Sequence, residues 1–167
     1  MVCLALNKEI STMAIDNFKY KTGDMFQSNA TYFVNAVNTV GTSGKGLALQ
    51  VKRLYPESVV EYEKACKEGN FKVGDVLMTP TNDGKHIIHF PTKKHWKNQS
   101  QYQYIEEGLD CLRHLCLNLP NGKIVAIPQI GCGLGGLDWS RVHKLIITYL
   151  SDIKHITFYI YGPNTTN

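Results

Sequence analysis

Two glycine-rich segments are the part of this chain best suited to hold an anion. The first glycine segment, GTSGKG, covers residues 41–46, and the second, GCGLGG, covers residues 131–136. Glycine costs backbone entropy on folding, but it lets backbone N–H groups approach a ligand closely, and the start of a following helix favours negative charge. Two such segments together predict a clamp for a diphosphate. The alternative is a pair of tight turns that hold no ligand.

Neither segment has the spacing of a common nucleotide-binding motif. Residues 41–46 lack the GxxxxGK[ST] pattern of a P-loop, and no GxGxxG follows a first strand, which argues against a Rossmann dehydrogenase. The chain has five cysteines, an odd number, and no Cys or His spacing typical of a metal site. We therefore expect reduced thiols, no metal and no cofactor.

The composition suits one domain. The chain has 167 residues, 43% of them hydrophobic, and a net charge of +4, which fits an anionic ligand but fits a plain lysine-rich surface equally well. No stretch is long and apolar enough to span a membrane, and MVCLALNKEIST is a poor signal peptide. We expect a cytoplasmic protein with a loose leader over residues 1–14 and a single domain over residues 15–167.

Apolar patterning and turn residues predict an alternation of strands and helices. Strands are expected at 15–21, 31–37, 75–79, 86–90, 123–128 and 155–161, and helices at 47–55 (ended by Pro56), 57–68, 101–118 and 139–150. This order predicts an α/β protein, a three-layer α/β/α sandwich with a mixed or largely parallel central sheet. Both glycine segments follow strands, and ligands collect at the carboxyl ends of parallel strands, so one shared site is expected.

The order and spacing of four motifs resemble the macrodomain family over residues 16–162. They are GDM at 23–25, VNAVN at 34–38, GKG at 44–46 and GCGLGG at 131–136. Within the family, residues 38–56, HFPTKKHW at 89–96 and GCGLGGLDW at 131–139 resemble DarG-type antitoxins, whose macrodomains remove ADP-ribose from thymidine bases in DNA. The resemblance implies a pocket for ADP-ribose.

The resemblance also implies roles for individual residues. Asp24, beside Met25, would bind the adenine amino group, although a turn residue after Gly23 is the other interpretation. Asn38 would contact the distal ribose, and Asn35 would tie down its own loop. The remaining contacts would come from the backbone of Gly44, Lys45 and Gly46 at the distal ribose and phosphate, from Gly131, Cys132, Gly133, Leu134, Gly135 and Gly136 at the diphosphate, from Thr92, and from Tyr161 with residues 162–164 beside the adenine.

Lys93 is the catalytic candidate that the resemblance implies. A related branch that hydrolyses glutamate esters uses a lysine in a similar Thr-Lys-Lys context to attack the anomeric carbon. A lysine nucleophile needs an uncharged amine, which the nearby positive charges of Lys94 and Lys97 favour. Lys93 could instead stabilise charge on a leaving group. That branch has an aspartate where this chain has Gly135, whereas the DarG-type pattern has glycine there.

Other residues near these motifs have weaker assignments. Cys132 has no partner base in the sequence and is not expected to be a nucleophile, and Asp138 is expected to cap the helix at 139–150. The run Lys94, His95, Trp96, Lys97 combines an indole ring with positive charge and could form a rim for single-stranded nucleic acid. The other interpretation makes Trp96 a partly buried loop anchor.

Three functions follow from these expectations. The first is a hydrolase that removes ADP-ribose from a modified target, with ADP-ribosylated thymidine in single-stranded DNA as the expected partner. The second is a phosphatase for ADP-ribose 1″-phosphate, and the third is a non-catalytic protein that only binds ADP-ribose. DarG-type antitoxins carry a further toxin-binding domain, for which this chain has no room. We expect a free-standing, monomeric protein, acting in the host cytoplasm if a phage encodes it.

Overall fold

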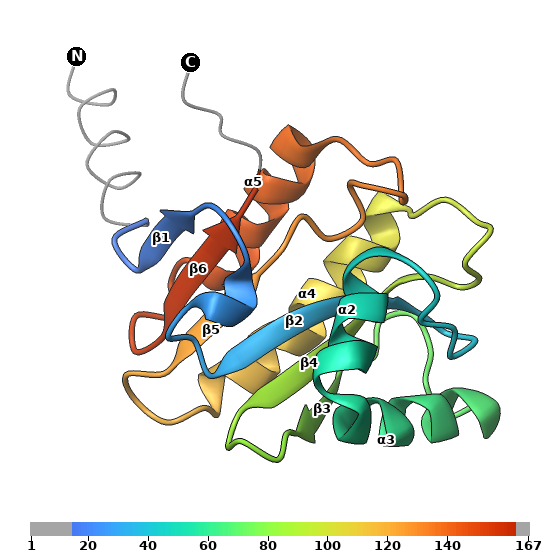
Figure 1. Cartoon of the computed structure of the whole chain (residues 1–167). Coiled ribbons are helices and arrows are strands. Elements are labelled where there is room, and N and C mark those ends of the chain that lie inside the picture. The colour runs from blue at the N-terminus through green and yellow to red at the C-terminus, as the bar shows by residue number, and fades with distance from the viewer. Residues whose placement is uncertain (1–14, 163–167) are drawn as a thin grey trace.

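The computed structural model describes residues 15–162 and places six strands in one sheet (Figure 1). The strand order is β1-β6-β5-β2-β4-β3, and every neighbouring pair is parallel except β3 and β4. The mixed sheet predicted from the sequence is confirmed. The strands are β1 (Phe18–Lys21), β2 (Tyr32–Asn38), β3 (Leu77–Pro80), β4 (His86–Lys93), β5 (Ile124–Ile127) and β6 (Thr157–Tyr161).

Helices cover both faces of this sheet and complete the three layers. Helices α2 (Gly46–Leu54) and α3 (Pro56–Lys67) pack with Phe33 on one face, and α4 (Tyr102–Leu117) and α5 (Trp139–Leu150) pack with Val34 on the other. Successive residues of a strand point to opposite faces, so a strand buried on both faces is apolar throughout. A short 3₁₀ helix, η1 (Met25–Gln27), was not predicted from the sequence.

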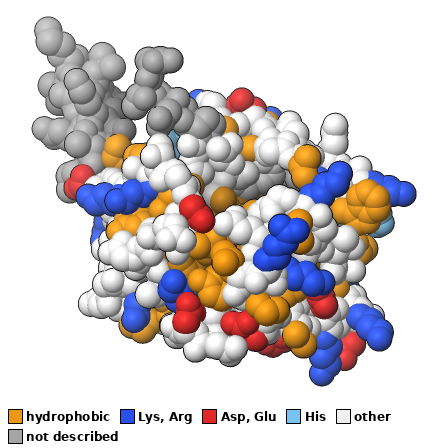
Figure 2. Space-filling view, in the orientation of Figure 1, with side chains coloured by type: hydrophobic (Ala, Val, Ile, Leu, Met, Phe, Trp, Pro, Cys, Tyr) orange, Lys and Arg blue, Asp and Glu red, His pale blue; other side chains and the backbone are white. Residues whose placement is uncertain are grey.

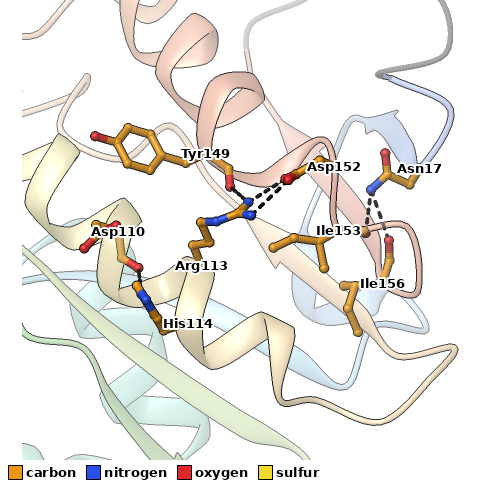
Figure 3. A network of polar contacts seen from close by, with 8 residues as sticks. All are labelled: Asn17, Asp110, Arg113, His114, Tyr149, Asp152, Ile153 and Ile156. Atoms are coloured by element: carbon orange, nitrogen blue, oxygen red, sulfur yellow. Dashed lines mark hydrogen bonds and ion pairs between the residues drawn. The ribbon is translucent and has the colours of Figure 1, made fainter.

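The first and last strands begin later than predicted. The strand expected from residue 15 starts at Phe18, because residues 15–17 form a turn closed by a bond from the Phe18 N–H to the Ile15 carbonyl (3.0 Å). The amide of Asn17 donates to the carbonyls of Ile153 (2.9 Å) and Ile156 (3.4 Å), as Figure 3 shows, and these residues precede β6. The predicted leader over residues 1–14 lies outside the described residues, as do residues 163 and 164.

Two prolines lie at the boundaries of elements. The helix expected to stop at Pro56 does end there, because α2 ends at Leu54, and Pro56 is also the first residue of α3, where a missing N–H costs no helical bond. The strand expected at 86–90 continues through Pro91 to Lys93: Pro91 pairs with Val37 of β2, and the register shifts after that pair, between Val37 and Asn38. This shift places Lys93 beside Asn38 at the edge of the sheet.

An ionic contact between helices fixes the layer formed by α4 and α5. Arg113 of α4 donates to the carbonyl of Tyr149 in α5 (2.8 Å) and forms two bonds with the Asp152 carboxylate (2.5 and 2.9 Å), as Figure 3 shows. The paired geometry of guanidinium and carboxylate holds the end of α5 against α4. Within residues 15–162, no helix has the length and apolar character needed to cross a membrane.

Candidate functional site

Three loops leave neighbouring strands at the same edge of the sheet. β2 lies between β4 and β5, and all three strands are parallel. Their carboxyl ends lead into the first glycine segment, into residues 94–100 and into the second glycine segment. The prediction that both glycine segments lie at one edge is confirmed, and Lys93 ends the third strand of the group.

Asn38 gives the first of these loops its shape. Its side-chain oxygen accepts backbone N–H bonds from Val40 (3.1 Å), Gly41 (3.0 Å) and Thr42 (3.2 Å), and its amide donates to the Thr42 carbonyl (2.9 Å). Asn35 was expected to tie down this loop, and that expectation is wrong. Asn35 is buried in β2, where its amide lies 3.3 Å from Nδ1 of His89.

A buried polar network of residues from α3 and β4 holds the backbone of Asn38 in place. The hydroxyl of Tyr62 donates to the Asn38 carbonyl (2.7 Å), and the Tyr62 ring stacks on His89 with centroids 5.0 Å apart. His89 Nε2 lies 3.1 Å from the Ser58 carbonyl, so we assign its proton to Nε2 and leave Nδ1 to accept from Asn35. Burial lowers the pKa of His89 to about 4, so the ring is neutral near pH 7. Sequence reasoning missed Tyr62, because nothing distinguishes it from an ordinary core residue of α3.

The glycines of the second segment serve different purposes. A Cβ added at Gly135 would collide with Ser100 Oγ and with the carbonyl oxygen of Gly131, and Gly131 has a φ of 74°, which disfavours other residues. The carbonyl of Gly135 accepts from the Ser100 N–H (3.0 Å), which joins this segment to the loop after β4, and the Leu137 N–H bonds the Gly131 carbonyl (3.0 Å) and closes the turn. Gly133 has no positive φ, and a Cβ there would meet nothing within 4 Å. Turn geometry therefore accounts for Gly131 and Gly135 but not for Gly133.

Lys93 connects the two glycine-containing loops. Its half-buried side chain donates from Nζ to the carbonyl of Leu134 in the second glycine segment (3.2 Å). Its own carbonyl accepts from the N–H of Thr39 (3.2 Å), and the Thr39 hydroxyl donates to the Lys94 carbonyl (2.8 Å). Lys93 is the residue that the sequence predicts to be catalytic. The structure places it between the two loops predicted to hold a diphosphate.

Two buried hydroxyl groups next to these loops have no partner within the described residues. Ser43 Oγ lies in the first glycine segment and Ser100 Oγ lies against the second, and both serines are only 6% exposed. A buried hydroxyl without a hydrogen bond is costly, and no described residue offsets that cost at either serine. Sequence reasoning missed both, although the position of Ser43 inside a glycine segment was a usable signal.

Cys132 is not built as a nucleophile. Burial, with a smaller contribution from the charge of Asp138, raises the pKa of its thiol to about 11. Its Sγ contacts the Ile130 carbonyl (3.4 Å) rather than a base. Asp138 caps α5 as expected, because its carboxylate accepts from the Arg141 N–H (3.1 Å).

The residues expected to surround an adenine lie at the β1 and β6 end of the same edge. Asp24 is exposed; its carboxylate accepts from the Phe26 N–H (3.0 Å), which caps η1, and from the Gln50 amide (3.2 Å). Met25 is buried in the core beside it. Tyr161 ends β6 and is half-buried, opposite Lys21 in the register. Adenine binding by these residues stays a prediction.

The segment after Lys93 presents an exposed aromatic ring among positive charges. Trp96 is 50% exposed; Lys97 Nζ lies 5.1 Å from its ring centroid and the His95 ring lies 5.3 Å away. Val40 and Leu134, on the other two loops, are also exposed, whereas Thr92 is buried. Figure 2 shows lysine and arginine side chains lying next to exposed hydrophobic ones on one face of the molecule.

Metal and disulfide chemistry have no visible basis at this edge. Among residues 15–162, no group of three His, Cys, Asp or Glu side chains is arranged to hold a metal ion. The four cysteines in that range are free thiols: Cys66, Cys111, Cys116 and Cys132.

Comparison with known proteins identifies the family. The family model of the Macro domain matches residues 34–146. The chain belongs to the macro domain family. This macro domain is 43% identical over 148 residues to a DNA ADP-ribosyl glycohydrolase of Mycobacterium tuberculosis, which covers 87% of this chain and 42% of that protein. A DNA ADP-ribosyl glycohydrolase of Thermus aquaticus is 35% identical over 150 residues, covering 87% of this chain and 41% of that protein.

Solved structures agree with this assignment. The macrodomain of Mycobacterium tuberculosis DarG superposes with a TM-score of 0.82 at 42% identity, covering 87% of this chain and 97% of that one. Thermosipho africanus DarTG in complex with ADP-ribose superposes with a TM-score of 0.77 at 35% identity, covering 92% of this chain and 43% of that one. This macro domain spans less than half the length of the curated relatives described above.

Proposed function

We propose that this macro domain binds ADP-ribose and hydrolytically removes it from a modified target, an ADP-ribosylated thymidine in single-stranded DNA. The hydrolysis breaks the bond between the distal ribose and the base. Water supplies a hydroxyl to the ribose carbon and a proton to the base. Relatives at 35–43% identity are named DNA ADP-ribosyl glycohydrolase, which supports this choice of substrate.

The observation that carries the proposal is the bond from Lys93 Nζ to Leu134. It places an amine between two glycine-rich loops, and a buried serine hydroxyl in or against each loop has no partner among the described residues. Glycine-rich loops of this kind suit a diphosphate. An anomeric carbon bound next to the second phosphate would then lie near Lys93. From there the amine can attack that carbon or stabilise the leaving base.

The two other functions would use the same pocket. A phosphatase would place the 1″-phosphate near Lys93 and Asn38, and a non-catalytic binder would need only the loops. The retained Thr92-Lys93 sequence favours catalysis over binding alone. The second candidate is therefore the phosphatase. The two activities differ in their product, because the hydrolase releases ADP-ribose and the phosphatase releases phosphate.

The first prediction concerns Lys93. Wild type, Lys93→Ala and Lys93→Arg would be incubated with single-stranded DNA carrying ADP-ribosylated thymidine, and released ADP-ribose would be measured. We expect release by wild type and a loss of at least about 100-fold in Lys93→Ala, the range for removal of a positioned catalytic group. ADP-ribose binding by Lys93→Ala, measured by calorimetry, should persist.

Lys93→Arg separates the two chemical roles. Arginine keeps the positive charge but has no usable free amine, because it stays protonated. An inactive Lys93→Arg indicates a nucleophilic amine, and an active one indicates charge stabilisation. No release by wild type, with tight ADP-ribose binding, would reject the hydrolase. Phosphate release from ADP-ribose 1″-phosphate would then identify the phosphatase.

A further inference from the structure

A polar cavity of about 560 Å³ opens beside the end of β4, outside the residues so far assigned to ADP-ribose. Residues from four regions line it: the end of β2, the connection between α3 and β3, the residue after β4, and the start of α4. The lining residues that matter here are Thr39, Lys72, Lys94, Gln101, Gln103 and Tyr104. Its volume is in the range of ordinary small-molecule sites.

Thr39 makes this cavity continuous with the candidate catalytic centre. Its N–H bonds the Lys93 carbonyl (3.2 Å), and its hydroxyl bonds the Lys94 carbonyl (2.8 Å). Successive residues of an extended chain point in opposite directions. Lys93 accordingly reaches the second glycine segment, whereas Lys94 extends over the ring of Tyr104, 5.9 Å from its centroid. A substrate chain bound at Lys93 therefore has this cavity immediately beside it.

The charges of the cavity favour an anion. Neither Lys72 nor Lys94 forms an ion pair among residues 15–162. Glu107 is the acidic residue of the lining, and its carboxylate accepts from the amide of Gln103 (2.9 Å). The lining thus contains two ammonium groups without an ion pair among the described residues and one carboxylate that already has a donor.

The remaining groups suit a nucleobase. Tyr104 is half-buried and is the aromatic residue of the lining. The side chain of Gln101 does not cap α4, so its amide is available to the edge of a base. Aromatic rings beside positive charges are the usual elements of a single-stranded nucleic acid site, because bases stack and phosphates pair with lysine.

We propose that this cavity is a subsite for the nucleotide that neighbours the modified thymidine, with the phosphate between Lys72 and Lys94 and the base against Tyr104. The proposal rests on the proposed function, because it assumes a DNA substrate. It predicts that the enzyme distinguishes a modified DNA strand from a modified single nucleoside. The cavity binds part of the modified DNA strand, whereas the modified nucleoside does not reach it.

The test compares two substrates and two charge-reversal variants of the whole chain. The substrates are ADP-ribosylated thymidine nucleoside and an ADP-ribosylated single-stranded oligonucleotide. The variants are Lys72→Glu, in the cavity, and Lys144→Glu, an exposed lysine of α5 that changes the net charge equally. Binding of a fluorescent, unmodified oligonucleotide across a salt series gives a readout that does not depend on turnover.

We expect Lys72→Glu to raise KM for the oligonucleotide about three- to tenfold and to reduce the salt dependence of binding by about 0.7 in log–log slope, the contribution of one phosphate contact on a single strand. Turnover of the nucleoside should not change, and Lys144→Glu should match wild type on both substrates. Tyr104→Leu should weaken oligonucleotide binding by about fivefold or more if a base stacks there.

Equal effects of Lys72→Glu and Lys144→Glu on the oligonucleotide would overturn the subsite and leave the hydrolase intact. Equal losses by Lys72→Glu on both substrates would also overturn it, because the nucleoside does not reach the cavity. Failure of wild type to release ADP-ribose from either substrate would instead reject the proposed function. Unmodified oligonucleotide binding that is unchanged in Lys72→Glu would then reject the subsite separately.

Discussion

Gly133 and Gly135 form a matched pair for asking what the second glycine segment is for. Gly135→Ala should lower the free energy of unfolding by about 1–3 kcal/mol, because its Cβ would collide with the Gly131 carbonyl and Ser100 Oγ. Gly133→Ala should leave it unchanged or raise it by up to about 1 kcal/mol, because its Cβ meets open space. Urea unfolding of both variants measures this difference.

Binding of ADP-ribose by the same pair provides the second half of the prediction. If backbone N–H groups at Gly133 approach a diphosphate, Gly133→Ala should weaken ADP-ribose binding in calorimetry without destabilising the fold. Full affinity in Gly133→Ala would contradict a direct role for this glycine. The two variants thus separate glycine needed for a turn from glycine needed for a ligand.

Asn35 and Asn38 show how far sequence reasoning reaches at single residues. The NAVN spacing indicated two important amides, and the structure keeps both, but their local tasks differ from the prediction. Asn38 shapes the loop, and Asn35 bonds a histidine on the neighbouring strand. The partners of a buried amide depend on which strands are adjacent, and His89 is 54 residues away along the chain. No local pattern contains that information.

Among the elements, β4 carries a titratable group in the core. The pKa of His89 falls from 6.5 in the unfolded chain to about 4 in the folded one, through burial. In the unfolded chain His89 therefore binds a proton below about pH 6.5, whereas in the folded chain it binds one only below about pH 4. Stability is full above about pH 6.5 and should fall by about 3 kcal/mol as the pH drops to 4.

Urea unfolding at several pH values tests this contribution. The loss between pH 6.5 and 4 should be smaller in His89→Gln than in wild type, because glutamine has no proton to bind. His114→Gln, at an exposed position of α4, should keep the wild-type profile. Parallel profiles for wild type and His89→Gln would contradict the assignment.

The type and order of the elements were predictable, whereas several boundaries were not. The hydrophobic periodicity of residues 139–150 gave α5 with its observed bounds, because a helix stripe and an aspartate cap are local signals. The extension of β4 through Pro91 was missed. Proline normally ends a strand, but Pro91 pairs with Val37 of β2 and lies beyond His89, the last residue of β4 that pairs with β3. The sequence pattern therefore predicted a loop at Lys93, whereas in the structure Lys93 is the last residue of β4.

On the scale of the whole molecule, a ligand held by three loops should stabilise all of the sheet. A ligand that binds only the folded state adds about 2.7 kcal/mol at 100 times its Kd. For a chain of this size, ADP-ribose should raise Tm by about 5–10 °C. Thermal unfolding with and without ADP-ribose measures the shift.

Lys93→Ala serves as the control for the thermal shift. It should show a shift of similar size, because Lys93 is proposed to act in the reaction more than in binding. AMP, which lacks the distal ribose, should give a smaller shift than ADP-ribose. Absence of any shift with ADP-ribose would contradict a pocket formed by the two glycine segments.

The sheet order has a consequence for synthesis on the ribosome. Within residues 15–162, the strand partner of β1 is β6, which is also the last strand to emerge. Along the chain, the elements from α2 to β5 likewise lie between the two glycine segments. When a nascent chain has emerged as far as β4, it contains the first glycine segment but not the second. Its strand β1 still has no partner strand. Both the ligand site and the sheet are therefore completed only after β5 and β6 have been synthesised.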